Sequence, residues 1–262
     1  MKVIISVSIV LFLALWIVSP VVAGSSIMGM PSHTQLTVAL EKACAKGVNN
    51  GAIFSPCEMW VGVVRLDGTV AVVARNGHDP WRGSRVIAMQ KANTARLFSK
   101  DRGLALSTAN LFSAVQPGGS LFGLQFSNPI DTQAAYQGSA AQYGTLADPA
   151  VGRRVGGVNV FGGGLALYDV KGRIIGGLGV SGDSSCADHA IAWRIRHTLG
   201  LDYVPAGVNK AEYGGAVAPV TGDDNIIYGS GGFSHAGCGF GEKTVTDLPA
   251  VSPVPTATAM VK

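Results

Sequence analysis

Two short sequences place a histidine beside an aspartate, a pairing that can hold a metal ion. They are His78-Asp79, in the turn sequence Gly77-His78-Asp79-Pro80, and Asp188-His189, in the apolar stretch 184–200. Imidazole suits many transition metals, so His78 and His189 are the candidate metal-ligating residues. Neither lies in an H-E-x-x-H motif or a tight cluster, and a solvated turn is the plainer interpretation of His78. A third histidine, His235, lies in a glycine-rich stretch and is predicted to be incidental.

The run from Gly177 to Gly182 reads G-x-G-x-x-G, and Asp202 lies twenty residues farther on. This spacing is typical of a dinucleotide site, where glycines let a pyrophosphate approach a helix N-terminus. The context argues against that site, because a hairpin turn precedes the strand and no convincing strand follows the helix. Glycines inside a strand have another use, which is close approach of a second backbone. No G-x-S-x-G occurs either, so no motif by itself indicates an enzyme.

Four cysteines allow three disulfide pairings. We favour Cys44–Cys57 with Cys186–Cys238, because each pair joins near neighbours in the chain and the second ties the tail to a helix. Residues 1–23 read as a cleaved secretory signal peptide, with an apolar run too short for a typical membrane span. An uncleaved N-terminal anchor is the alternative. The chain is therefore predicted to be secreted or periplasmic, where disulfides form, with no membrane span after cleavage.

The amino-acid composition is typical of a folded globular domain. Of 262 residues, 47% are hydrophobic and 14% charged, so a core can form and a disordered charged tail is excluded for the chain as a whole. The net charge of +4 comes without a run of Lys and Arg, so we expect no nucleic-acid partner. From residue 205 to 262 glycine-rich and then Pro/Thr/Ala-rich stretches predict a loosely held tail, with one strand at 226–228.

Periodicity predicts an α+β domain over residues 32–204 that carries a central antiparallel sheet of about five strands. A long structured loop, 113–157, interrupts it. The 84–98 helix is apolar on two sides, so we expect it to lie between the sheet and another layer. On the last helix His189, Trp193, Arg196 and His197 share a face, which suggests a surface for a partner or ligand; a partly exposed face is the alternative. Helices are predicted at 34–47, 84–98 and 184–200, with strands at 59–66, 69–75, 158–161, 164–170 and 173–181.

Three sequences, taken in order, match a family pattern. They are Val63-Val64-Arg-Leu-Asp67-Gly68, Lys91-Ala92-Asn93-Thr94-Ala95, and the glycine-rich segment from Phe161 to Gly182 with Asp188. The chain resembles the haem-binding, haem-degrading-type family that includes GlcG, HbpS and the C-terminal domain of PduO-type adenosyltransferases. The resemblance covers residues 34–200.

The resemblance implies an antiparallel α+β fold, a homo-oligomer, and binding of haem or a related tetrapyrrole. It implies Lys91, Thr94, Ser181, Gly182 and Asp188 as motif positions of the site. No histidine aligns with a haem ligand of the family, so His78 and His189 are candidate haem ligands from this sequence alone, because neutral imidazole is the commonest protein ligand of haem iron. Glycines 176, 177 and 179 would leave a flat slot on the sheet beside the 84–98 helix, and Arg85, Lys91 or Arg196 could meet the propionates. The same surfaces suit a subunit interface. A small-molecule or haem-degrading enzyme, and a ligand-free oligomeric accessory protein, are the alternatives.

Overall fold

A computed structural model describes residues 29–45, 51–101, 103–206, 212–213, 224–229, 232–242 and 248–255. The predicted signal peptide, 1–23, lies outside these residues, as do parts of the predicted tail. Among the helices of the described ranges, none is long and apolar enough to cross a membrane.

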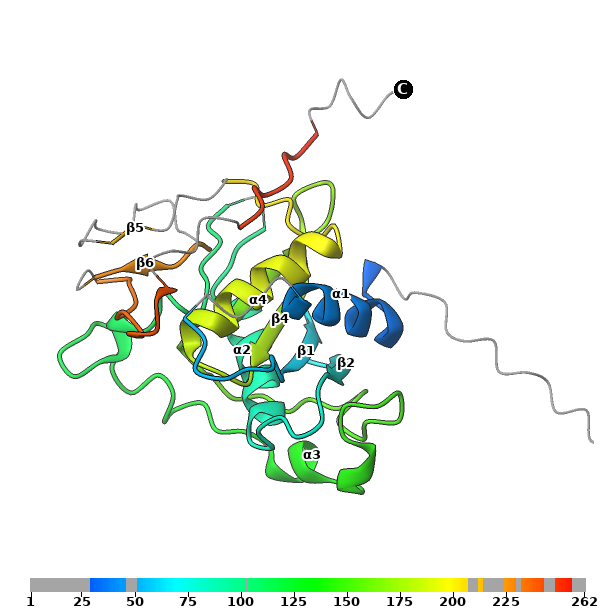
Figure 1. Cartoon of the computed structure of the whole chain (residues 1–262). Helices are drawn as coiled ribbons and strands as arrows, with labels where there is room; N and C mark the ends of the chain where they lie inside the picture. Colours follow the sequence, from blue (N-terminus) through cyan, green and yellow to red (C-terminus); the bar gives the residue numbers. More distant parts are fainter. Residues whose placement is uncertain are drawn as a thin grey trace, which may run out of the picture.

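The core of the fold is a four-stranded antiparallel sheet with the order β2-β1-β4-β3 (Figure 1). Its strands are β1 (Trp60–Arg65), β2 (Val70–Arg75), β3 (Gly164–Tyr168) and β4 (Ile174–Ser181). The Asp67-Gly68 turn joins β1 to β2 as predicted, with φ +86° at Gly68. The α+β class is confirmed, but the central sheet has four strands, because residues 158–161 form none. A separate two-stranded sheet pairs β5 (Glu212–Tyr213) with β6 (Ile227–Tyr228). Strand β6 lies within the strand predicted at 226–228.

Helices cover both faces of this sheet. One face packs against α1 (His33–Ala45) and α4 (Ser185–Thr198), and the other against α2 (Ser84–Leu97). Strand alternation decides which side chains meet which helix. Val61 and Val63 join the α1–α4 core, whereas Trp60 and Val64 join the α2 core.

The glycines of β4 bring α2 directly onto the sheet. A Cβ on Gly177 would overlap the carbonyl oxygen of Ala92, and one on Gly179 would overlap that of Ala88. The prediction of a flat ligand slot above these glycines is therefore wrong, because the backbone of α2 already fills that space. Close backbone approach, the plainer interpretation, is the use that the G-x-G-x-x-G run serves, and no dinucleotide could reach it.

The long 113–157 segment forms the layer on the other side of α2, which confirms that this helix is sandwiched. The segment contains η2 (Ser113–Val115), α3 (Thr132–Tyr136) and η3 (Ala140–Gln142). Arg85 of α2 fixes it: Nε and Nη2 donate to the Asp148 carboxylate at 2.9 and 2.5 Å, and Nη1 donates to the Ala135 carbonyl at 2.6 Å. The Tyr143 ring stacks on the guanidinium, and Arg85 Cζ lies 3.7 Å from the centroid of this ring.

The described part of the C-terminal segment packs against α4. Trp193 Nε1 donates to the Pro249 carbonyl at 2.8 Å, and Arg196 forms a buried ion pair with Asp224. The face of α4 that suggested an external partner is thus covered by the chain itself, and of its four residues His197 alone is exposed. The described residues of this segment are held by the Arg196–Asp224 ion pair, by the Cys186–Cys238 disulfide, and by the burial of Ile226, Ile227 and Tyr228.

Both predicted disulfides are confirmed, Cys44–Cys57 and Cys186–Cys238. They are consistent with an extracellular location. Ser184 caps α4 by accepting a hydrogen bond from Ala187 N, and α2 begins at Ser84.

Candidate functional site

Lys91 and Asp188, two of the motif positions, form one buried ion pair. Lys91 Nζ lies 2.6 Å from Asp188 Oδ2 and donates also to the Val180 carbonyl at 2.9 Å. The other oxygen of Asp188 accepts from Asp183 N at 3.0 Å. Burial raises the pKa of Asp188 to about 6 and lowers that of Lys91, and each charge partly offsets the effect on the other. The pair joins α2 to α4, and burial keeps it from touching a ligand in this conformation.

Thr94, Ser181 and Gly182 also lie inside the protein. Thr94 Oγ1 donates to the Gln90 carbonyl and accepts from Asn159 N at 2.9 Å, which ties α2 to the strand-like segment before β3. Ser181 ends β4 opposite Trp60. A Cβ on Gly182 would lie 2.5 Å from the Glu58 carbonyl. Ser181 and Gly182 thus lie at the β4–α4 junction, whereas Thr94 positions α2 against the segment before β3.

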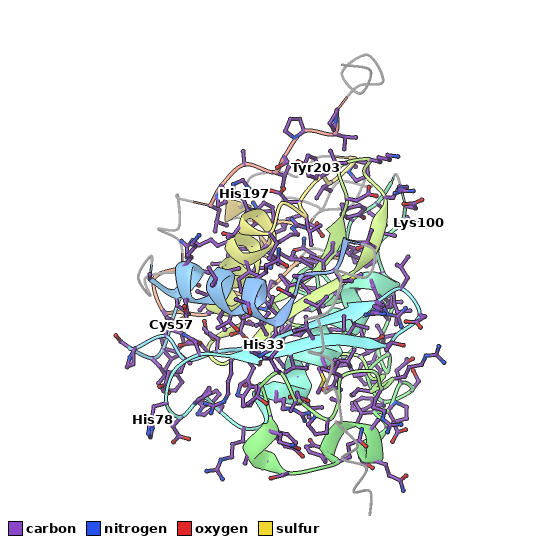
Figure 2. The ribbon with its side chains drawn as sticks, turned by 90° about the vertical axis from the view of Figure 1, so that its right-hand side faces the viewer. His33, Cys57, His78, Lys100, His197 and Tyr203 are labelled. Atoms are coloured by element: carbon purple, nitrogen blue, oxygen red, sulfur yellow. A yellow bond between two sulfur atoms is a disulfide. The ribbon has the colours of Figure 1, made fainter. Side chains whose placement is uncertain are left out.

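His78 lies at the surface, in the turn after β2 (Figure 2). Its backbone N–H donates to Glu58 Oε1 at 2.6 Å. Beside it lies a hollow of about 220 Å³, which Phe54, Trp81 and Gly182 help to line. The Phe54 and Trp81 rings meet edge to face at 5.0 Å. This hollow is smaller than ordinary ligand pockets of roughly 300–1,000 Å³, so it could take only an edge of a macrocycle.

His189 is 1% exposed, in the middle of α4. Neither ring nitrogen has a hydrogen-bond partner among the described residues. Burial, with the charges of Arg196, His235 and Lys91, lowers the pKa of His189 to about 3, so the ring is neutral. His78 is exposed and His189 is enclosed, so the structure does not bring the two predicted ligands to one site.

The cations predicted to meet propionates already hold carboxylates of the chain. Arg85 pairs with Asp148, Lys91 with Asp188, and Arg196 with Asp224, and all six side chains are almost fully buried. These three cations do bind carboxylates, but the carboxylates belong to aspartates of the same chain and not to haem propionates. The aspartates lie 28 to 97 residues away in sequence, so the sequence did not connect them with their partners.

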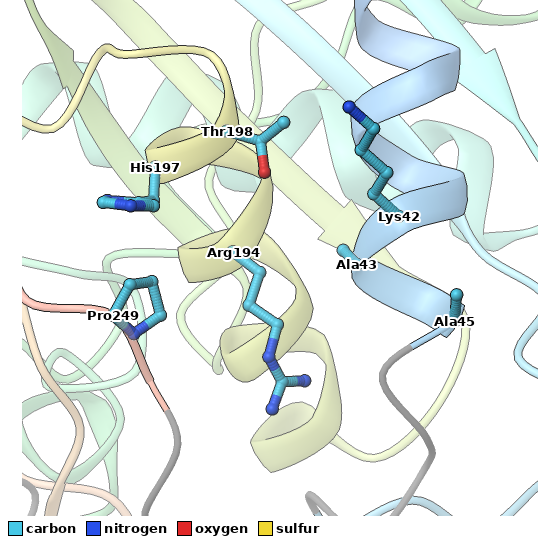
Figure 3. Close-up of a pocket in the computed structure, with 7 residues that line it drawn as sticks. All are labelled: Lys42, Ala43, Ala45, Arg194, His197, Thr198 and Pro249. Atoms are coloured by element: carbon cyan, nitrogen blue, oxygen red, sulfur yellow. The ribbon is translucent and has the colours of Figure 1, made fainter.

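A pocket of about 590 Å³ lies on the outer side of α4 (Figure 3). Arg194, His197 and Thr198 contribute from α4, and Lys42, Ala43 and Ala45 from the end of α1, as Figure 3 shows. Pro249 of the C-terminal segment also lines it. The pocket therefore combines cationic side chains with small apolar walls, and its volume is in the ordinary range for ligands.

His197, on the wall of this pocket, is oriented by a carboxylate. Its Nδ1 lies 2.7 Å from Oδ2 of Asp202, which is 2% exposed while His197 is 41% exposed. Because a carboxylate only accepts hydrogen bonds, Nδ1 carries the proton of this bond. Nε2 has no hydrogen-bond partner within the described residues. A His–Asp pair of this kind fixes the ring and leaves one nitrogen for a metal.

A third hollow, of about 540 Å³, contains His33 beside Gly144 and Arg75. Both nitrogens of His33 are engaged, Nε2 with the Gly144 carbonyl at 2.9 Å and Nδ1 with Thr37 Oγ1 at 3.5 Å. Of the three hollows, the one on α4 thus offers a histidine with an unengaged nitrogen, a carboxylate behind it and nearby cations.

The model of the HbpS-like family, described as haem-degrading proteins, matches residues 34–195, more than half of the chain. The chain belongs to the HbpS-like family. No curated protein matches it significantly. The HbpS-like match contains the Lys91–Asp188 pair and the whole 113–157 segment, but it ends before His197, Asp202 and the C-terminal segment.

Several solved structures are similar to this HbpS-like chain. The Klebsiella pneumoniae protein ORFY is 24% identical, with a TM-score of 0.42, over 63% of this chain and 86% of that one. A PduOC–haem complex is 27% identical, with a TM-score of 0.44, over 64% and 94% of the two chains. A Streptomyces reticuli HbpS variant is 20% identical, with a TM-score of 0.38, over 69% and 97%.

In the sequence, His197 belongs to the predicted contact face of the last helix and Asp202 to the dinucleotide-like spacing, and no motif connects the two residues. The signal was a His followed five residues later by an Asp across the end of a helix. That spacing puts the two side chains near each other only because Gly200, at φ +63°, turns the chain back after α4. Asp202 then bridges to Tyr168 at the end of β3, which holds it in place.

Proposed function

We propose that this protein is an exported haem-binding protein that stores, scavenges or senses haem or a related tetrapyrrole. Membership of the HbpS-like family carries the proposal, since the match spans the sheet and most of the three long helices. The two disulfides and the signal-like residues 1–23 support export. The PduOC structure, which contains haem, agrees with the ligand class but is too distant to argue for it.

The pocket on α4 is our proposed site, in place of His78 and His189. Its residues fit the group: His197 has an unengaged Nε2, and Asp202 holds the ring in the tautomer that a metal requires. Lys42, which is exposed, offers positive charge for a propionate, while Ala43, Ala45 and Pro249 are apolar. Bound haem would supply an iron that takes an imidazole as axial ligand and changes oxidation state. Because the pocket is open to solvent, the residues exclude water from one side of the ligand only.

Titration of the purified mature chain with hemin tests the proposal. We expect a saturable shift of the Soret band at micromolar hemin, with one haem per chain at the end point. The absence of a saturable shift, in a chain whose circular dichroism shows it folded, would exclude haem binding. It would favour a ligand-free accessory protein.

Single substitutions test the site apart from the function. His197→Ala should weaken hemin binding and change the Soret position, because it removes the axial nitrogen. His78→Ala and His189→Ala test the two histidines first predicted, and His33→Ala is a matched control in a different hollow. An unchanged spectrum in His197→Ala with a changed one in His78→Ala would move the ligand to the hollow beside Phe54 and Trp81. Binding itself would still stand.

Oxidative haem degradation is the second candidate, because the family description names that activity. It requires an added reductant and oxygen. In the presence of ascorbate and catalase, an enzyme would cause loss of the Soret band and release of iron to a chelator faster than free hemin does. A stable Soret band under these conditions would leave binding without turnover.

We also propose a homo-oligomer. Phe122 and Phe126 of the 113–157 segment are 59% and 82% exposed, and their rings meet edge to face at 6.5 Å. Exposed aromatic side chains of this kind are typical of protein contacts. Light scattering should give a mass that is a multiple of the chain, and Phe122→Ser with Phe126→Ser should lower it.

A further inference from the structure

Cys186, His235 and Cys238 form a compact cluster at the N-terminal end of α4, whereas His197 of the α4 pocket lies near the C-terminal end of this helix. The two sulfur atoms and a His235 ring nitrogen all lie within 4.8 Å of one another. Cys186 lies in the first turn of α4, and the other two residues come from the C-terminal segment. Cys186 and His235 are each 3% exposed. The sulfur atoms are joined as a disulfide, so the cluster has two chemical states.

Hydrogen bonds set the tautomer of His235. Its Nδ1 lies 2.5 Å from the Ala236 carbonyl, and its Nε2 lies 2.8 Å from Ser185 Oγ. A carbonyl only accepts, so Nδ1 carries the proton and Nε2 keeps its lone pair, which accepts from the Ser185 hydroxyl. Burial lowers the pKa of His235, which keeps the ring neutral. A neutral imidazole with a carbonyl behind its protonated nitrogen is the form that binds metals.

Contacts other than the disulfide also hold the segment that carries His235 and Cys238. Glu242 accepts from the backbone N–H groups of Cys238 and Gly239 at 2.7 and 3.1 Å through Oε1, and from Phe240 at 2.9 Å through Oε2. His235 N donates to the Ile227 carbonyl at 2.7 Å in the β6 strand. The segment is tied to the rest of the chain by the buried Arg196–Asp224 ion pair to α4, and by Ser113 N, which donates to the Ser234 carbonyl at 3.0 Å. Together these contacts would keep the three ligands close after the sulfur–sulfur bond is broken.

We propose that reduction of the Cys186–Cys238 disulfide converts this cluster into a binding site for Zn²⁺ or a similar thiophilic cation, with His235 as the third ligand. Two thiolates, one imidazole and an open fourth position are a known zinc donor set. Disulfide and metal exclude each other, because each requires the same two sulfur atoms. Metal binding would hold the C-terminal segment on α4 in reducing surroundings, as the disulfide does in oxidising ones.

The conversion balances with a dithiol as reductant. The dithiol gives two electrons and two protons to the disulfide, which becomes two thiols, while the dithiol closes to its own disulfide. Zn²⁺ then displaces both thiol protons to solvent and forms two Zn–S bonds. His235 Nε2 exchanges its hydrogen bond from Ser185 for a Zn–N bond.

Cobalt titration of the full chain tests the site, with Co²⁺ as a coloured substitute for Zn²⁺. In the chain reduced anaerobically with a phosphine, we expect one Co²⁺ to bind with thiolate-to-cobalt charge-transfer bands and the visible bands of tetrahedral cobalt. The oxidised chain should show neither. Added Zn²⁺ should displace the cobalt and prevent re-formation of this disulfide on exposure to air, as read by mass spectrometry.

Three variants decide the assignment. Cys44→Ser with Cys57→Ser removes the other thiols and should keep the bands, whereas Cys186→Ser with Cys238→Ser should lose them. His235→Gln should keep both thiols and bind Co²⁺ at least about tenfold more weakly. Bands that survive in the Cys186/Cys238 variant overturn the proposal, as does full-strength binding by His235→Gln. Loss of the native circular dichroism on reduction of the wild-type chain would also overturn it, because the site requires the folded cluster. None of these outcomes bears on hemin binding by the oxidised chain.

Discussion

Lys91 Nζ lies 2.6 Å from Asp188 Oδ2, although the two residues are 97 positions apart and belong to helices on opposite faces of the sheet. The contact is made beside Gly163, where a Cβ would lie 3.1 Å from Nζ and 3.0 Å from Asp188 Cβ. The second and third sequences of the family pattern therefore each contribute one residue of this ion pair. Its role is to join α2 to α4.

Removing the Lys91 cation should destabilise the folded chain. Lys91→Met leaves the Asp188 carboxylate buried without its partner, and we expect a loss of about 3–5 kcal/mol of unfolding free energy. Lys91→Met with Asp188→Asn removes both charges and retains an acceptor for Asp183 N, so it should recover more than half of the loss. Urea unfolding followed by circular dichroism measures both variants. Equal destabilisation of the single and double variants would show that the pair contributes by packing alone.

The close contact between α2 and β4 predicts that Gly179 accepts no side chain. Gly179→Ala places a Cβ against the Ala88 carbonyl and 2.6 Å from Ala92 N, so the helix must move away from the sheet. We expect a loss of at least about 1–3 kcal/mol, as for other overpacked cores. Gly83→Ala is the matched control, since nothing lies within 4 Å of its Cβ and the backbone at this helix start has φ −62°. A neutral Gly179→Ala in thermal unfolding would contradict the close approach.

The buried neutral ring of His189 predicts a pH dependence of stability. Its pKa falls from 6.5 in the unfolded chain to about 3 in the folded one. The unfolded chain therefore binds a proton that the folded chain refuses, so stability that is complete above pH 6.5 is lost as the pH falls toward 3. The slope for one such group is at most about 1.4 kcal/mol per pH unit.

His189→Leu isolates this effect, because the ring nitrogens have no hydrogen-bond partners among the described residues to lose. Relative to wild type, the variant should gain about 2 kcal/mol more at pH 5 than at pH 7. The raised pKa of Asp188 acts in the opposite direction, but it is present in both proteins and cancels. A difference between the two proteins that does not vary with pH would mean that the folded chain protonates His189.

The hydrogen bond between His197 and Asp202 predicts a change in hemin affinity if haem binds in the α4 pocket. Asp202→Asn keeps an acceptor for Nδ1 but removes the negative charge that makes the imidazole a stronger ligand. We expect hemin to bind about 10- to 100-fold more weakly, with the Soret band still shifted. Asp169→Asn, which breaks the surface pair with Arg173, is the control and should leave the affinity unchanged. An Asp202→Asn variant with wild-type affinity would remove His197 from the site.

Local pattern was enough for much of the fold. The Asp67-Gly68 hairpin, the three long helices, both disulfides and the two-sided burial of α2 follow from spacing of apolar residues, turn residues and cysteines that lie near one another in the chain. The hairpin and the helices depend on neighbours within a few residues, whereas the disulfides join cysteines 13 and 52 residues apart that are consecutive among the four cysteines of the chain. The family pattern was visible in the same way.

The tertiary structure decided where the chemistry lies. From the sequence, Arg85, Lys91 and Arg196 were expected to be available to a ligand, but each forms an ion pair with an aspartate that is distant in the chain. The glycines of β4 are likewise covered by α2 and not by a ligand. His197 gained a candidate role only because α1, α4 and Pro249 enclose one pocket. Spacing in a sequence specifies periodicity and turns, whereas burial and the partner of each charge depend on contacts between distant segments, which exist only once the chain has folded.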